Sequence, residues 1–134
     1  MDETLPRVLI VEDNDADAFL ATRSLRGYKA AISILKDGFE ALEYLVATCD
    51  PKELPELVLL DLSLPEIHGL DILRKLKAQE KTKNLRVVIL TGNHQEKVAM
   101  DCYKLNCDGV LLKPVTGETI EPIMNKCGIP KMGE

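Results

Sequence analysis

The chain has 134 residues, a length typical of one domain with a single hydrophobic core. Its net charge of −5 argues against nonspecific binding to nucleic acid or anionic lipid, and a chain without tryptophan offers few surfaces for stacking on bases. No apolar run approaches the roughly 18 residues that span a bilayer, and the start MDETLPR lacks the features of a secretion signal. We therefore expect a cytoplasmic domain without nucleic-acid or membrane partners.

The first strand and helix are expected at Arg7–Val11 and Ala16–Leu25. Strand and helix alternate from there to the end of the chain, with strands at Ala30–Leu35, Leu57–Leu60, Val87–Leu90 and Gly109–Leu112, and helices at Gly38–Thr48, Leu70–Gln79, Glu96–Leu105 and Gly117–Lys126. Three strands, VLIV, LVLL and VVIL, are apolar throughout, which is typical of strands covered on both faces. Strict alternation predicts right-handed βαβ units. The expected fold class is α/β, a doubly wound parallel five-stranded (βα)5 sheet in one domain over residues 1–134, with its core at about 7–126.

The cysteines form no CxxC pair, and the two histidines, His68 and His94, lie at no ligand spacing from them. This pattern favours buried thiols in a reducing compartment over a zinc or redox site. The four thiols concerned are Cys49, Cys102, Cys107 and Cys127.

Polar side chains follow four of the five predicted strands. Because sites in parallel sheets form outside the carboxyl ends of the strands, these residues are expected to meet at one edge. The second strand is followed by KDG, which contributes a turn and little else. The converging residues are Glu12 and Asp13 after the first strand, Asp61 after the third, Thr91 and Gly92 after the fourth, and Lys113 after the fifth.

Crowded carboxylates repel one another unless a cation lies between them, and Mg²⁺ prefers oxygen ligands of this kind. With that charge masked, the Asp61 carboxylate could attack phosphorus, and Lys113 could offset charge on the transferred oxygens. The Thr91 hydroxyl and the Gly92 backbone N–H could bind the remaining oxygens. The set predicts a Mg²⁺-dependent site that carries a phosphoryl group on Asp61.

Each signal also has a simpler structural interpretation. Asn14 or Asp15 could cap the first helix, and Asp17 suits the positive end of its dipole. Asp61 could instead be the partner of Lys113 in a structural salt bridge. The simultaneous presence of all these groups at four strand ends favours the phosphoryl site.

These residues resemble the receiver domain of bacterial two-component response regulators from about Arg7 to Lys126. The resemblance rests on the acidic pair Glu12-Asp13, on Asp61 followed by a turn of the form xxxPxxxG, on Thr91, and on Lys113-Pro114. It implies that Asp61 accepts phosphate from a sensor histidine kinase, and that Thr91 and Lys113 bind the phosphate. It further implies that Mg²⁺ is bound by Glu12, Asp13, Asp61 and the Ser63 carbonyl, and that the Lys-Pro bond is cis.

Two departures from the family pattern matter, and two further positions bear on the phosphate. His68 stands where an acidic residue usually precedes the turn glycine, and Val110 stands where the family usually has an aromatic switch residue. Because Val110 cannot swing as a ring does, the response to phosphate is expected to be muted or to take another form. Ser63 and Asn93 flank the phosphate in relatives and tune its loss, but as small polar residues they predict no lifetime.

The leading hypothesis is a stand-alone signalling receiver, similar to those that serve phytochrome-type kinases and not itself an enzyme. Its output would be contact with a downstream phosphotransfer or effector protein, or with a second copy in a homodimer. An aspartyl-phosphate phosphohydrolase is the enzymatic alternative, but it normally has an acid where Ser63 stands. The third hypothesis is a degenerate receiver that only scaffolds a partner.

Overall fold

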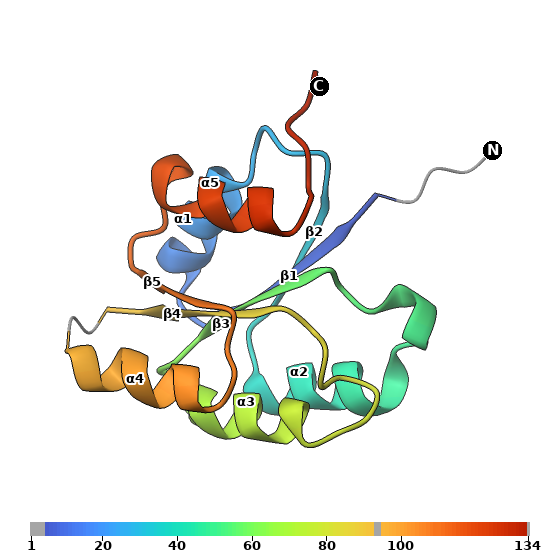
Figure 1. Cartoon of the computed structure of the whole chain (residues 1–134), viewed down its shortest axis with the longest axis vertical. Helices are drawn as coiled ribbons and strands as arrows, with labels where there is room; N and C mark the ends of the chain where they lie inside the picture. The colour runs from blue at the N-terminus through green and yellow to red at the C-terminus, as the bar shows by residue number, and fades with distance from the viewer. Residues whose placement is uncertain (1–4, 93–94, 134) are drawn as a thin grey trace.

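The computed structural model describes residues 5–92 and 95–133. Five parallel strands form one sheet in the order β2-β1-β3-β4-β5, which is the predicted doubly wound arrangement (Figure 1). Each strand differs from its predicted bounds by at most one residue. The strands are β1 Arg7–Val11, β2 Ala31–Leu35, β3 Leu57–Asp61, β4 Val87–Thr91 and β5 Gly109–Leu112.

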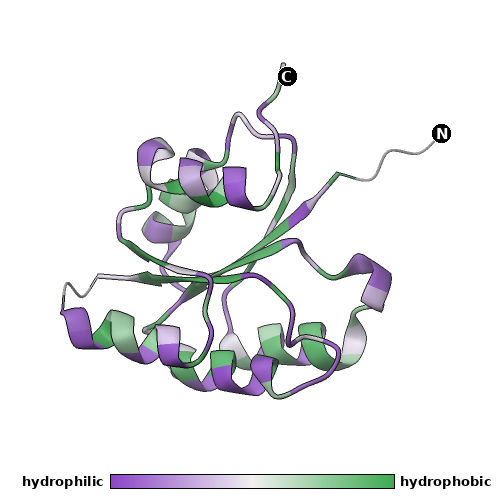
Figure 2. Cartoon of the chain, in the orientation of Figure 1, coloured by the Kyte–Doolittle hydropathy of each residue, from purple (hydrophilic) through white to green (hydrophobic). Residues whose placement is uncertain are grey.

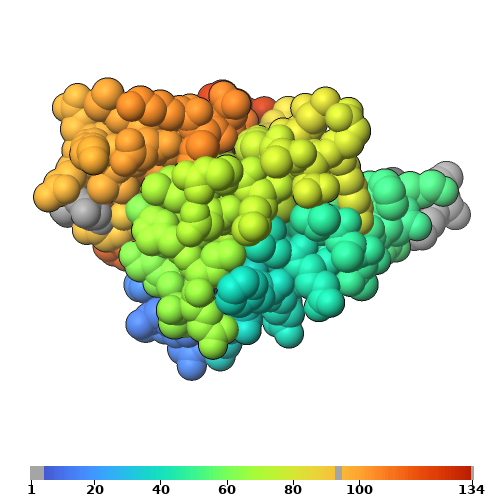
Figure 3. All heavy atoms as spheres, turned by 90° about the horizontal axis from the view of Figure 1, so that it is seen from below, coloured from blue at the N-terminus to red at the C-terminus, as the bar shows by residue number. Residues whose placement is uncertain are grey.

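Helices cover both faces of the sheet (Figure 1). One face carries α1 and α5, and the other carries α2, α3 and α4, which form a continuous layer in Figure 3. The helices are α1 Asp15–Ser24, α2 Gly38–Glu43, α3 Gly69–Lys77, α4 Glu96–Lys104 and α5 Gly117–Lys126.

The second helix differs most from its prediction. Its α-helical part ends at Glu43, and the chain continues as a π-helix, Tyr44–Thr48, before a short 3₁₀ turn at Pro51–Glu53. The Lys81 ammonium donates to the carbonyls of Val46 and Cys49 at the end of the π-helix. The sequence did not predict this capping because the lysine lies in the loop that follows α3.

Helix α5 has its predicted bounds, and α1, α3 and α4 differ from their predictions by one or two residues at their ends. The Asn14 side chain accepts the Asp17 N–H, so α1 begins at Asp15 rather than Ala16. The His68 Nδ1 accepts the Leu70 N–H, so α3 begins at Gly69. Helix α3 ends at Lys77 instead of Gln79, and the Thr82 hydroxyl donates to the carbonyl of Leu76 in its last turn.

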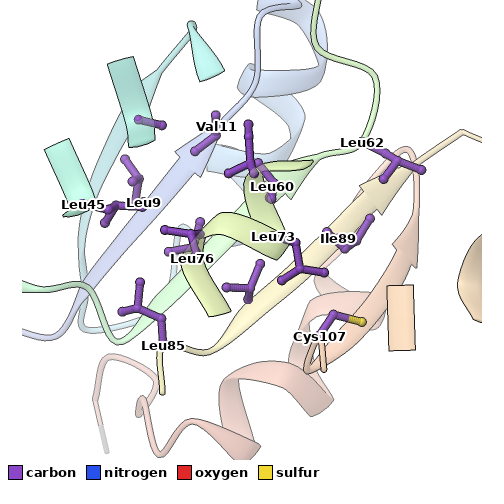
Figure 4. Close-up of a cluster of buried hydrophobic side chains, with 14 of the residues drawn as sticks. Leu9, Val11, Leu45, Leu60, Leu62, Leu73, Leu76, Leu85, Ile89 and Cys107 are labelled. Atoms are coloured by element: carbon purple, nitrogen blue, oxygen red, sulfur yellow. The ribbon is translucent and has the colours of Figure 1, made fainter. Parts of the chain in front are cut away.

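The three central strands are almost fully buried and separate two layers of core. On the side of α2, α3 and α4, Leu73 and Leu76 pack among strand residues such as Leu9 and Leu60 (Figure 4). The residues that alternate with these along β1 and β3 face α1 and α5. Figure 2 shows apolar strands between helices that mix apolar and polar residues. This two-sided burial explains the unbroken apolar runs in the sequence.

The predicted burial of the cysteines is confirmed for three of the four. Cys49, Cys102 and Cys107 are buried and Cys127 is half-buried, all as free thiols. Burial raises the pKa of Cys102 to about 11, so its thiol stays protonated at neutral pH. Among the described residues the cluster able to hold a metal is acidic and includes no cysteine. Within residues 5–92 and 95–133, no helix has the length and apolar character needed to cross a membrane.

The segment after α5 extends the core beyond the predicted limit near Lys126. The Lys29 N–H donates to the Pro130 carbonyl at 2.9 Å, and Tyr28 pairs with Lys131 in an antiparallel bridge. Ile129 is 3 % exposed and packs in the core layer beneath α1 and α5. The segment therefore fastens the end of α5 to the loop between α1 and β2.

We expect Ile129→Ala to lower the free energy of unfolding by about 2–4 kcal/mol, because it removes a buried side chain and leaves a cavity. Denaturant unfolding followed by circular dichroism measures this loss. Met132→Ala is the control, since Met132 is 65 % exposed and its truncation should change stability by less than about 0.5 kcal/mol. Equal effects of the two substitutions would show that the segment is not docked.

Candidate functional site

The predicted carboxylates meet at the carboxyl edge of the sheet, where β1 lies beside β3. Glu12 follows β1 and is fully buried, Asp61 ends β3 and is 2 % exposed, and Asp13 is exposed. One carboxylate oxygen from each of the three lies within 4.8 Å of the others. The three carboxylates therefore meet at one edge of the sheet, as expected from their positions at the strand ends.

Lys113 lies among the carboxylates and is bound to three of them. Its Nζ is 2.8 Å from Glu12 Oε1, 3.0 Å from Asp61 Oδ1 and 3.1 Å from Asp17 Oδ2. The Lys113 N–H donates to the Thr91 carbonyl at 2.9 Å, which continues the pairing of β5 with β4. The Lys113-Pro114 bond is cis, as the resemblance implied. The salt bridge weighed as the simpler interpretation of Asp61 is thus present.

The pKa values of the Glu12 carboxyl and the Lys113 ammonium are both raised, for different reasons. Burial raises the pKa of Glu12 to about 7, assisted by the nearby Asp61 and opposed by Lys113 and the Asn14 N–H. Burial alone lowers the pKa of Lys113, but its contacts with Glu12, Asp61 and Asp17 outweigh burial and raise it above its usual range. Lys113 is therefore a permanent cation, whereas Glu12 changes charge near neutral pH.

The acidic turn after β1 is held by its own hydrogen bonds. The Asn14 N–H donates to Glu12 Oε2 at 3.1 Å, and the Asn14 side chain accepts the Asp17 N–H at 2.9 Å. Of the two capping candidates, Asn14 is the cap, whereas Asp15 is the first helical residue and pairs with Lys36. The sequence assigned Asp17 to the helix dipole and missed its contact with Lys113.

Gly69 allows α3 to lie directly against the end of β3. A Cβ on Gly69 would be 2.7 Å from both the Asp61 carbonyl oxygen and Leu62 Cα, which are backbone atoms that cannot move aside. The Gly69 N–H donates to the Leu62 carbonyl at 2.9 Å. The Ser63 N–H donates to Asp61 Oδ1 at 3.1 Å, so the loop also orients the carboxylate.

The other predicted positions lie around this centre. Thr91 is the buried last residue of β4, and Gly92 follows it on the surface. Asn93 lies outside the described residues. Val110 is half-buried and packs against the core layer on the α3 and α4 side, whereas Leu112, two residues further along β5, is 41 % exposed.

The sequence of the chain matches the response regulator receiver domain family over residues 8–125. The chain belongs to this family. It is 34 % identical to "Probable methanogenesis regulatory protein FilR2" of Methanothrix harundinacea over 117 residues, which are 85 % of this chain and 76 % of that protein. It is 33 % identical to the response regulator Rcp1 of Synechocystis over 110 residues, 79 % of this chain and 75 % of Rcp1.

Solved receiver structures share this fold. The bacteriophytochrome response regulator AtBRR is 30 % identical, with a TM-score of 0.84 over 98 % of this chain and 100 % of its own. The Mn²⁺-bound form of Rcp1 is 29 % identical, with a TM-score of 0.75 over 90 % of each chain. The phosphorylated cyanobacterial phytochrome response regulator RcpA is 27 % identical, with a TM-score of 0.76 over 92 % of this chain and 91 % of its own.

The acidic cluster of this receiver fits a divalent metal ion. Its oxygens come from two buried carboxylates and one exposed carboxylate, and oxygen ligands are those that hard divalent cations prefer. The exposed position of Asp13 leaves the site open to solvent on one side. Glu12 and Asp61 share one ammonium, so a divalent cation bound there would add positive charge beside two buried carboxylates.

We expect Gly69→Ala to lower the free energy of unfolding by about 1–3 kcal/mol, because the added methyl group must displace backbone at Asp61 and Leu62. Gly117→Ala is the matched control, since Gly117 is likewise the first residue of its helix and a Cβ there has open space. Thermal unfolding of the two variants measures the difference. A Gly69→Ala protein as stable as Gly117→Ala would contradict this account of the close approach.

The metal-free protein should lose stability as the pH rises, because Glu12 must then carry a buried charge. A carboxyl whose pKa rises from 4.5 to about 7 on folding stabilises the protein at low pH, and that contribution is lost as the pH rises through about 7. Glu12→Gln keeps the neutral form at every pH. We therefore expect the melting temperature of Glu12→Gln to exceed that of the wild type by more at pH 8 than at pH 5, measured with a chelator present.

The control for this pH series is Glu66→Gln, an exposed carboxylate in the loop between β3 and α3. Its melting temperature should follow that of the wild type at both pH values. If the difference in melting temperature between Glu12→Gln and the wild type stays constant from pH 5 to pH 8, Glu12 does not titrate in this range.

Proposed function

We propose that this receiver accepts a phosphoryl group on Asp61 and that Mg²⁺ is its metal. The proposal rests on the burial and the contacts of the Asp61 carboxylate. It is 2 % exposed, yet its Oδ1 accepts the Ser63 N–H at 3.1 Å and lies 3.0 Å from the Lys113 ammonium. The carboxylate is thus oriented by a backbone N–H and by a cation that both contact one of its oxygens.

The chain offers a separate role for each remaining group. An Asp61 oxygen forms the new bond to phosphorus as the bond from phosphorus to the donor breaks, and the electron pair leaves with the donor. The Lys113 ammonium, the Thr91 hydroxyl and the Gly92 N–H bind the oxygens of the transferred group. Glu12, Asp13, Asp61 and the Ser63 carbonyl would hold Mg²⁺, which would supply positive charge against those oxygens.

Family membership supports a sensor histidine kinase as the donor and a protein as the recipient of the signal. Ser63 also bears on the enzymatic alternative, because a phosphohydrolase of this type places an acid two residues after its nucleophile. Here that residue is a small hydroxyl residue whose backbone N–H binds Asp61. The proposal is therefore a signalling receiver that promotes its own phosphorylation and dephosphorylation and has no separate substrate.

Incubation with acetyl phosphate and Mg²⁺, followed by intact mass spectrometry, tests the assignment. We expect the wild type to gain one phosphoryl group and Asp61→Asn to gain none, because the amide cannot serve as the acceptor. Asp71→Asn is the control, since Asp71 is an exposed aspartate on α3 whose carboxylate pairs with Arg74. This variant should be phosphorylated like the wild type.

Two results would contradict the proposal. Phosphorylation of Asp61→Asn to the wild-type extent would move the acceptor to another residue. A wild type that binds Mg²⁺ in calorimetry but gains no phosphoryl group from either acetyl phosphate or phosphoramidate would support the scaffold hypothesis.

A further inference from the structure

Lys113 has one carboxylate partner that lies outside the metal cluster. Two of its three partners, Glu12 and Asp61, belong to the acidic cluster that can hold a metal. The third, Asp17, comes from the first turn of α1 and is absent from that cluster among the described residues. Its oxygen lies 3.1 Å from the ammonium across 96 positions of sequence.

The position of Asp17 is fixed by the backbone rather than by the ion pair. Its N–H is bound to the Asn14 side chain, and the Asn14 N–H is bound to the Glu12 carboxylate. A chain of hydrogen bonds thus runs from Glu12 through Asn14 to Asp17 and ends on the ammonium that Glu12 also contacts. The Asp17 side chain is 32 % exposed and that of Lys113 is 17 % exposed, so water only partly screens the pair.

We infer that Asp17 is a positioning residue that keeps the Lys113 ammonium beside Asp61 while Glu12 and Asp61 serve as metal ligands. This inference rests on the proposed function. Carboxylate oxygens bound to a divalent cation attract an ammonium less, and the cation itself repels it. Asp17 is then the carboxylate that the ammonium retains, so Lys113 stays within reach of the incoming phosphoryl oxygens.

The helix dipole offers a simpler reason for an acidic residue at this position. Asp15 lies in the same turn of the same helix, so it serves that role equally, yet it pairs with Lys36 instead of Lys113. Asp15→Asn is therefore a matched control, since it removes the same charge from the same turn and leaves the contacts of Lys113 in place.

The first test observes the ammonium directly by proton–nitrogen NMR of lysine side chains in Mg²⁺-saturated, unphosphorylated protein. The Lys113 signal is identified by its loss in Lys113→Met. We expect a distinct ammonium signal in the wild type and in Asp15→Asn, and its broadening or loss in Asp17→Asn. An unchanged Lys113 signal in Asp17→Asn overturns the inference.

The second test is the rate of phosphorylation by phosphoramidate at saturating Mg²⁺. We expect Asp17→Asn to be slower than the wild type by about two- to fivefold, the effect of losing one partly exposed ion pair. Asp15→Asn should match the wild type, and Asp17→Glu should recover part of the rate. A faster Asp17→Asn protein would show that Asp17 competes with the phosphoryl group for Lys113, and overturns the inference.

The two tests separate this inference from the function on which it rests. If the wild type takes up no phosphoryl group, the proposed function fails, and the ammonium signal still decides whether Asp17 holds Lys113. If the wild type is phosphorylated and Asp17→Asn is equal to Asp15→Asn in both tests, the receiver function stands and the positioning role is wrong.

Discussion

The rest of the site depends on the burial of two carboxylates at neighbouring strand ends. Glu12 is fully buried and Asp61 nearly so, and neither can hold its charge there without a cation. Lys113, which directly follows β5, provides that cation, because its backbone N–H continues the pairing with β4 and so fixes where its side chain begins. The ammonium thus stabilises, in the metal-free protein, a cluster of negative charge whose composition suits a divalent ion.

Close packing of α2 and α3 also constrains this carboxyl edge of the sheet. Gly69 brings α3 against the Asp61 backbone, and Gly38 brings α2 against the following loop, where a Cβ would lie 2.5 Å from Ile67 Cγ2. The backbone N–H groups that orient Asp61 and its loop are therefore fixed by the core layer under α2 and α3. Helices α2 and α3 and the loop after β3 are packed too closely to move independently. A change of charge at Asp61 is therefore expected to shift them together.

How much of the fold and of the site the sequence could predict depends on whether each interaction leaves a local pattern in the sequence. Apolar runs revealed the buried strands, and their order along the chain revealed the edge where Glu12, Asp61 and Lys113 meet. Asp17 was missed because capping and the helix dipole already account for an acidic residue in a first turn. The Lys81 cap and the docking of Ile129 were missed for a related reason, since each joins a single residue to a distant loop whose path no local pattern specifies.

One of the departures from the family pattern, His68, has a physical explanation in this structure. His68 replaces an acidic residue, yet its Nδ1 accepts the Leu70 N–H, so it caps α3 through a lone pair rather than a charge. Asp17 is a third carboxylate in contact with Lys113, and Asp13 belongs to the adjoining acidic cluster, so these four carboxylates and one ammonium leave an excess of three negative charges when all are ionised. An anionic phosphoryl donor is repelled by such an edge. A bound divalent cation would remove most of that excess, which is the electrostatic reason to expect the proposed phosphoryl transfer to depend on the metal.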